Sequence, residues 1–100
     1  MTTKKLQPIH PGEVLREEFI EPMGMSQREF AEKIGVTHTR LNQIVNEKRS
    51  VTADTALRLA KALATTPEFW MNLQARYDLD QARDLSESKI EREVRPLVTK

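Results

Sequence analysis

The sequence predicts an all-α fold of five helices followed by a C-terminal helical extension. Apolar residues recur at helical spacing along most of the chain, and Ser or Thr stands where several of these segments begin. No strand pattern extends beyond a few residues. One hundred residues with 38% hydrophobic content suit a single small domain with one core.

The first predicted helix begins near Pro11, because proline suits a first helical turn, and Pro22 with Gly24 is expected to end it. Its expected buried stripe consists of Val14, Leu15, Phe19 and Ile20. The second helix has clear signals at both ends. Ser26 and Glu29 form a capping box, and Gly35 is placed to stop the helix in a left-handed conformation. Its expected apolar positions are Met25, Phe30, Ala31 and Ile34.

The third helix follows a tight break at Gly35, with Thr37 as its N-cap. This helix–short turn–helix spacing is that of a helix-turn-helix motif, in which residues 36–46 form the recognition helix. At about 100° per residue, the apolar side chains of this helix fall within roughly a third of its circumference. They are Leu41, Ile44 and Val45, and the opposite side carries Thr39, Asn42, Gln43 and Asn46. The segment contains no acidic residue, so its polar side can approach DNA without repulsion.

A polar loop, NEKRSV, leads to a fourth helix that Thr52 caps and a fifth that opens at Thr66-Pro67. The expected core positions of these two helices are Ala56, Leu59, Ala60, Leu63, Phe69, Trp70, Leu73 and Tyr77. The aromatic cluster of the fifth helix suits either the core or a dimer seam. After Asp78 the apolar face thins, although Ile90 and Val94 keep helical spacing before Pro96. We therefore expect an N-terminal arm (1–9), a helix-turn-helix domain (10–77) and a C-terminal extension (78–100) for dimerisation or partner binding.

The net charge is only +1, but its distribution is uneven. Residues 10–22 contain one arginine against four glutamates, whereas residues 26–49 contain five basic against three acidic residues. The chain has no cysteine, no apolar run near 20 residues and no signal-peptide core, which indicates a cytoplasmic protein that does not enter a membrane. His10 and His38 lie 28 positions apart without metal-like spacing, so no metal or cofactor is expected, and His10 is interpreted as a local structural residue.

The residue types of the recognition helix and its neighbours assign candidate contacts to double-stranded DNA. Thr39, Asn42 and Gln43 can bond base edges, while Gln27 can donate to a phosphate from the start of the second helix. Lys48 and Arg49 are expected to clamp phosphates; Arg40 suits a phosphate or a guanine, and His38 a DNA contact or a helix cap beside Thr37. The alternative for each is a solvated surface residue. The full DNA-binding set is Gln27, Thr37, His38, Thr39, Arg40, Asn42, Gln43, Lys48 and Arg49.

Residues 26–63, SQREFAEKIGVTHTRLNQIVNEKRSVTADTALRLAKAL, resemble the domain shared by phage repressors and XRE-type regulators. With HPGEVLREEFIEPMGMSQ before it and TPEFWMNLQARYDL after it, the pattern over residues 10–79 resembles HigA-type antitoxins, also called virulence-associated protein I. The resemblance implies a phage-repressor-like fold, a homodimer and a palindromic operator in the protein's own promoter. It also implies neutralisation of an mRNA-cleaving ribonuclease toxin. The chain departs from the family at Glu47, where glycine is frequent.

Three other functions compete with a repressing antitoxin. The first is a stand-alone XRE-type regulator without a toxin, which the sequence alone does not separate from an antitoxin. The second is a helical interaction module that no longer binds DNA, which acids on the recognition helix would favour. The third is an enzyme, which would require a nucleophile with its base, a metal set or a carboxylate pair in a pocket. We reject it because periodicity places the Glu17-Glu18 pair on an exposed helix face and the sequence has no glycine-rich phosphate loop. For the toxin, we expect one contact on the acidic first helix, at Glu13, Glu17, Glu18 and Glu21.

Overall fold

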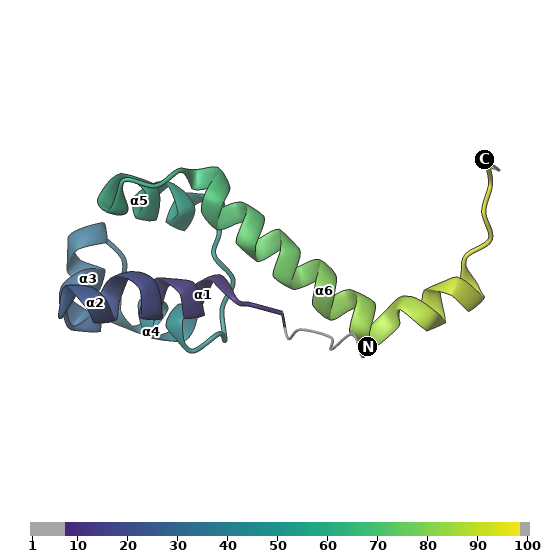
Figure 1. The fold of residues 1–100 in the computed structure, drawn as a ribbon, viewed down its shortest axis with the longest axis horizontal. Helices are drawn as coiled ribbons and strands as arrows, with labels where there is room; N and C mark the ends of the chain where they lie inside the picture. Colours follow the sequence, from purple (N-terminus) through teal and green to yellow (C-terminus); the bar gives the residue numbers. More distant parts are fainter. Residues whose placement is uncertain (1–7, 99–100) are drawn as a thin grey trace, which may run out of the picture.

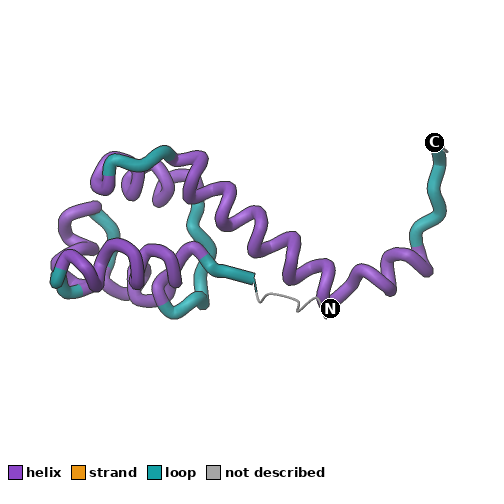
Figure 2. The backbone as a smooth tube through the Cα atoms, viewed as in Figure 1, coloured by secondary structure: helices purple, strands orange, loops and turns teal. Residues whose placement is uncertain are grey.

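The computed structural model describes residues 8–98 and places them in five helical segments, with no strand in that range. Their elements are α1 (Pro11–Val14), η1 (Leu15–Ile20), α2 (Glu21–Met23), α3 (Gln27–Ile34), α4 (His38–Val45), α5 (Ala53–Leu63) and α6 (Pro67–Glu93). The first three elements form one segment without a break. Figures 1 and 2 show all elements from α1 to α5 gathered into one body, from which α6 extends. The predicted all-α, five-helix fold is confirmed. The predicted arm lies largely outside the described residues.

The first helical segment runs through Pro22, so the prediction that this proline ends it was wrong. In its middle part, η1, the hydrogen bonds span five residues, as from the Glu21 N–H to the Arg16 carbonyl. This π-helical stretch restarts the hydrogen-bond ladder at α2 and places Pro22 in the first turn of that element. A missing N–H costs little there. Gly24 ends the segment with φ +67°, as predicted.

Hydroxyl side chains cap the four later helices at the predicted residues. The oxygens of Ser26, Thr37, Thr52 and Thr66 each accept a hydrogen bond from the backbone N–H three residues on, at 3.0–3.4 Å. Gly35 ends α3 with φ +77°, and the Val36 N–H returns to the Ala31 carbonyl at 3.0 Å. The turn of the helix-turn-helix therefore has the predicted conformation.

The core contains residues from every helical segment, and Trp70 is its largest fully buried side chain. The Trp70 side chain is fully buried, donates from Nε1 to Thr65 Oγ1 at 2.8 Å and lies against the ring of Phe19, with centroids 5.6 Å apart. The buried cluster comprises Leu15, Ile20, Phe30, Ala31, Ile34, Leu41, Ile44, Val45, Val51, Ala56, Leu59 and Trp70. Among the predicted core positions, Val14, Phe19, Met25, Leu63 and Leu73 are only partly buried at its edge.

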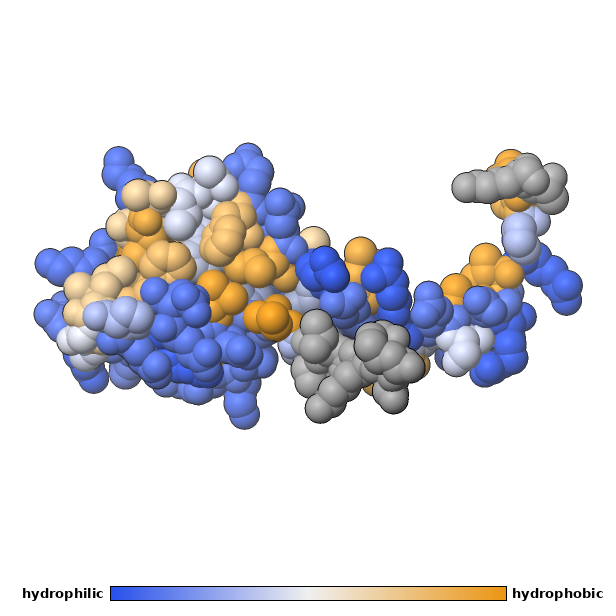
Figure 3. Space-filling model, viewed as in Figure 1, coloured by the Kyte–Doolittle hydropathy of each residue, from blue (hydrophilic) through white to orange (hydrophobic). Residues whose placement is uncertain are grey.

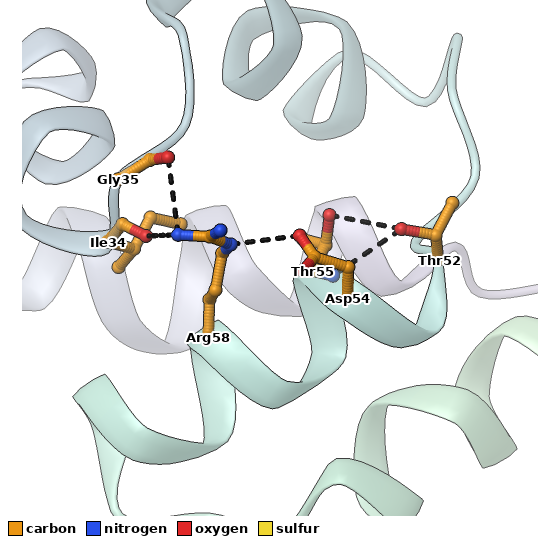
Figure 4. A network of polar contacts seen from close by, with 6 residues as sticks. All are labelled: Ile34, Gly35, Thr52, Asp54, Thr55 and Arg58. Atoms are coloured by element: carbon orange, nitrogen blue, oxygen red, sulfur yellow. Dashed lines mark hydrogen bonds and ion pairs between the residues drawn. The ribbon is translucent and has the colours of Figure 1, made fainter.

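Arg58 of α5 connects the turn after α3 to the body of the molecule (Figure 4). Its Nη1 donates to the carbonyls of Ile34 and Gly35 at 3.2 and 3.4 Å, and its Nε donates to Asp54 at 2.9 Å. These carbonyls are left without helical partners where α3 ends, so a cation is favourable there. The contact fixes the turn that precedes α4.

Helix α6 is continuous from Pro67 to Glu93 and passes position 78 without a break. Its first half packs on α5 and α1, and its second half changes direction and continues away from the body (Figure 1). Trp70 belongs to the core of the single chain, whereas Tyr77 is partly buried and contacts His10. Phe69, predicted as a core position, is exposed on the body, as is Leu57. Further exposed apolar side chains lie along the second half of α6, among them Leu79, Leu85 and Ile90, and apolar surface is visible on the outlying part (Figure 3). No described helix is both long enough and apolar enough to cross a membrane.

Candidate nucleic-acid interface

Helix α4 has the two-sided character that its sequence predicts. Leu41, Ile44 and Val45 are completely buried. His38, Thr39 and Asn42 are exposed on the other side, and Arg40 and Gln43 are half-buried at its edges. The exposed side offers amide, hydroxyl, imidazole and guanidinium groups without a carboxylate. Such a surface can donate to and accept from base edges in a major groove, which is wide enough to admit a helix.

The first helical segment holds the C-terminal end of α4 through backbone contacts. A Cβ atom at Gly12 would lie 1.8 Å from the Ile44 carbonyl oxygen, so only glycine permits this approach. Arg16 donates from Nη1 to the Val45 carbonyl at 2.8 Å, where α4 ends and a cation is favoured. The sequence reading assigned neither role. A glycine inside a predicted helix was the one available signal, because glycine is a poor helix former.

Gln27 and Asn42 join the beginning of α3 to the exposed side of α4. Asn42 Nδ2 donates to Gln27 Oε1 at 3.2 Å. Gln27 is the first residue of α3 and is half-buried, whereas Asn42 is exposed. The bond restricts both amides before any ligand arrives, which lowers the conformational cost of binding.

A second side-chain pair joins α4 to the loop that follows it. Arg49 Nε donates to Gln43 Oε1 at 2.8 Å, and the backbone N–H of Lys48 donates to the Gln43 carbonyl, also at 2.8 Å. Glu47, which lies between Gln43 and Lys48 in the chain, has φ +64°, a left-handed conformation that glycine adopts without strain. The structure thus gives a physical reason for the glycine that the resembled family often has at this position.

The N-terminal turn of α4 assigns different roles to Thr37 and His38. Thr37 Oγ1 accepts the Arg40 N–H and so provides the cap, which leaves His38 exposed at the first helical position. The alternative interpretation of His38 as the capping residue is therefore wrong. Lys48 lies exposed in the loop. Of the nine predicted residues, the structure brings Gln27, Asn42, Gln43 and Arg49 into two bonded pairs.

His10 is a buried structural histidine that caps the beginning of the first helical segment. It is buried, its Nδ1 accepts the Gly12 N–H at 2.8 Å, and its ring packs edge-on against Tyr77, with centroids 4.7 Å apart. Burial lowers the pKa of His10 from 6.5, and the carboxylates of Glu47 and Asp78 oppose this shift. The neutral imidazole that the hydrogen bond requires is therefore favoured in the folded protein.

Gln74 of α6 fixes the far end of the loop, a role that the sequence reading missed. This buried amide accepts the Val51 N–H through Oε1 at 2.8 Å and donates from Nε2 to Asp78 at 3.0 Å. An isolated glutamine on an amphipathic helix gives no signal of such a contact. Within residues 8–98, no three His, Cys, Asp or Glu side chains gather as a possible metal site.

The sequence and the fold of this chain are similar to those of known proteins. The helix-turn-helix family model matches residues 15–70. Virulence-associated protein I of Dichelobacter nodosus is 44% identical over 84% of this chain and 78% of its own. A HigA-family addiction module antidote protein from Coxiella burnetii superposes with a TM-score of 0.85 at 50% identity, over 91% of this chain and 99% of its own. Pseudomonas aeruginosa antitoxin HigA, solved with the higBA promoter, gives 0.86 at 42% identity, over 91% and 99%. This chain therefore belongs to the helix-turn-helix family, in the group that contains HigA-type antitoxins and virulence-associated protein I.

Proposed function

We propose that this protein is a sequence-specific DNA-binding antitoxin that represses its own operon from a palindromic operator and neutralises an mRNA-cleaving ribonuclease toxin. The observation that carries the DNA-binding part is the acid-free side of α4, with its amides paired to Gln27 and Arg49. The Pseudomonas relative, whose structure was solved with the higBA promoter, supports the same conclusion. The protein acts in the cytoplasm by binding and without catalysis.

In this proposal, base reading and positioning are divided between two groups of residues. Thr39, Asn42 and Gln43 face the base edges in the major groove. Gln27, Lys48, Arg49 and Arg40 contact phosphates and set the register of the helix, while Thr37 and His38 lie where the N-terminal end of α4 enters the groove.

The experiment that tests this division compares Asn42→Ala with Lys48→Ala on operator and scrambled duplexes over a salt series. We expect Asn42→Ala to weaken operator binding by about 1–3 kcal/mol and to leave scrambled DNA nearly unaffected. Lys48→Ala should weaken both duplexes similarly and flatten the salt slope by about one per subunit. If Asn42→Ala and Gln43→Ala both keep the full operator preference, α4 is not the reading helix.

We propose that two chains associate through the C-terminal extension, residues 78–100. Leu79 and Ile90 are about half exposed in the second half of α6, beside a shallow groove that also includes Ala82 and Arg83. Burying this surface in a two-fold partner would offset the cost of association, and a two-fold dimer matches a palindrome. Light scattering at micromolar concentration should give twice the monomer mass. A monomer that binds a palindrome tightly would contradict the proposal.

The toxin part of the proposal follows from the antitoxin and antidote names of the relatives. The acidic first helix, with Glu17, Glu18 and Glu21 exposed, suits a basic toxin and would mainly speed its association. The test is co-purification with the product of the adjacent gene, followed by charge reversal of these glutamates. Absence of any toxin gene or bound toxin would instead favour a stand-alone regulator.

A further inference from the structure

The hydrogen bond from Arg49 to Gln43 determines which way the Gln43 amide points. A guanidinium group has only donors, so the atom of Gln43 that faces Arg49 at 2.8 Å has to be the oxygen. The amide NH₂ group is therefore turned away from Arg49. Because Arg49 carries a positive charge, this is one of the stronger kinds of side-chain hydrogen bond.

The backbone of the loop places these two side chains together. The Lys48 N–H is bonded to the carbonyl of Gln43 itself, and the left-handed Glu47 turns the chain back toward α4. Arg49 thus follows directly after a residue whose backbone is tied to Gln43. Gln43 is also half-buried, which restricts its other rotamers. The pair therefore joins a half-buried side chain at the end of the helix to an exposed arginine whose neighbouring backbone is bonded to the same residue.

This orientation changes what Gln43 can recognise. A free glutamine reads adenine with both ends of its amide, since the oxygen accepts from N6 and the nitrogen donates to N7. In this protein one of the two lone pairs of the oxygen is already bonded to a cation, which disfavours acceptance from adenine N6. The other polar groups that the pair offers, the Gln43 NH₂ and the remaining Arg49 nitrogens, are all donors. Guanine matches them, because its major-groove edge presents two acceptors, N7 and O6.

We propose that Arg49 is a positioning residue that makes Gln43 select guanine over adenine in the operator. The inference rests on the proposed DNA-binding function and adds the base that one reading residue recognises. It gives Arg49 a role in specificity beyond the phosphate contact predicted from the sequence.

The experiment selects bound duplexes from a randomised DNA library with the full-length protein and sequences them. The variants are Gln43→Ala, Arg49→Ala, Arg49→Lys and, as a matched control for loss of a loop charge, Lys48→Ala. Gln43→Ala identifies the base pair that this residue reads. At that pair, the unchanged protein should prefer guanine to adenine about fivefold or more.

Arg49→Ala should remove most of this guanine preference, whereas Lys48→Ala should keep it while weakening all duplexes. Arg49→Lys separates charge from geometry: it should keep the salt dependence but lose most of the preference, because an ammonium lacks the planar donor array of arginine. Thermal melting of each variant confirms that it is folded. Three results would overturn the inference. They are a preference for adenine at the base pair that Gln43 reads, a guanine preference that survives Arg49→Ala, and an equal loss of guanine preference in Arg49→Ala and Lys48→Ala. If no sequence is enriched at all, the proposed DNA-binding function itself fails.

Discussion

Glu47 combines backbone strain with an acidic charge in the loop that is proposed to face phosphates. Its φ of +64° places a Cβ atom in the left-handed region, which costs a non-glycine residue roughly 1–2 kcal/mol. Replacing Glu47 by glycine would remove this strain, but glycine loses more backbone entropy on folding, which costs roughly 0.5–1 kcal/mol. We therefore expect Glu47→Gly to stabilise the protein by about 1 kcal/mol, which corresponds to a rise in Tm of about 4–8 °C for a chain of this size.

Two further variants separate strain from charge. Ala64 ends α5 with φ +56°, so Ala64→Gly should raise the Tm by a similar amount outside the proposed DNA-binding surface. Glu47→Ala removes the charge and keeps the Cβ atom, so it should leave the Tm nearly unchanged. Both Glu47 variants should tighten binding to operator and scrambled DNA, and Ala64→Gly should not.

The assay is thermal unfolding followed by circular dichroism, at one fixed protein concentration because association would shift the Tm. A pH above 7 keeps His10, which Glu47 influences, neutral in every variant. DNA binding is then measured at two salt concentrations. Equal melting temperatures for Glu47→Gly and Glu47→Ala would refute the strain argument. Unchanged DNA affinity in both would place the loop away from phosphates.

Three further substitutions test buried contacts outside the proposed DNA-binding surface. Because folding lowers the pKa of His10, the unfolded chain binds more protons just below pH 6.5, so the stability of the fold should decrease as the pH drops through this value. His10→Asn should remove this pH dependence of stability. If His38→Asn removed it equally, the assignment to His10 would be contradicted. Gly12→Ala should cost about 1–3 kcal/mol or more in urea unfolding, because the new Cβ meets a backbone carbonyl, and a neutral result would exclude the close approach. Gln74→Leu should cost about 1–3 kcal/mol by leaving a buried N–H unpaired, whereas Gln81→Leu on the exposed side of α6 should not; equal effects would argue against the hydrogen bond.

The features that were predictable from the sequence are those that depend on neighbouring residues. The caps at Ser26 and Thr37 and the left-handed Gly35 are local backbone requirements, and each requires one of a few residue types. The buried side of α4 followed from helical periodicity. The path through Pro22 did not, because it depends on a change of hydrogen-bond register inside the same helix, which composition does not indicate.

The contacts of the candidate site were less predictable, because they join residues far apart in the chain. Gln27 and Asn42 are 15 positions apart, and Arg16 and the Val45 carbonyl are 29 apart. The residue types indicated that Gln27 and Asn42 are polar and suited to DNA, and they assigned no role to Arg16. Only the fold shows that Asn42 is bonded to Gln27 and Arg16 to the Val45 carbonyl. The strain at Glu47 was indicated indirectly, by a glycine that is frequent in the resembled family.

The way α4 is held has a consequence for how its specificity can change. Its C-terminal end contacts the first helical segment through carbonyl oxygens, those of Ile44 and Val45, and the turn before it is held by Arg58 through two more carbonyls. Backbone carbonyls are present whatever side chain the residue carries. The buried apolar side of the helix gives further support and contributes nothing to the exposed surface. A substitution at Thr39 therefore leaves these backbone contacts intact, and one at Asn42 removes only the bond to Gln27. One framework can thus present different base-reading residues and recognise different operators.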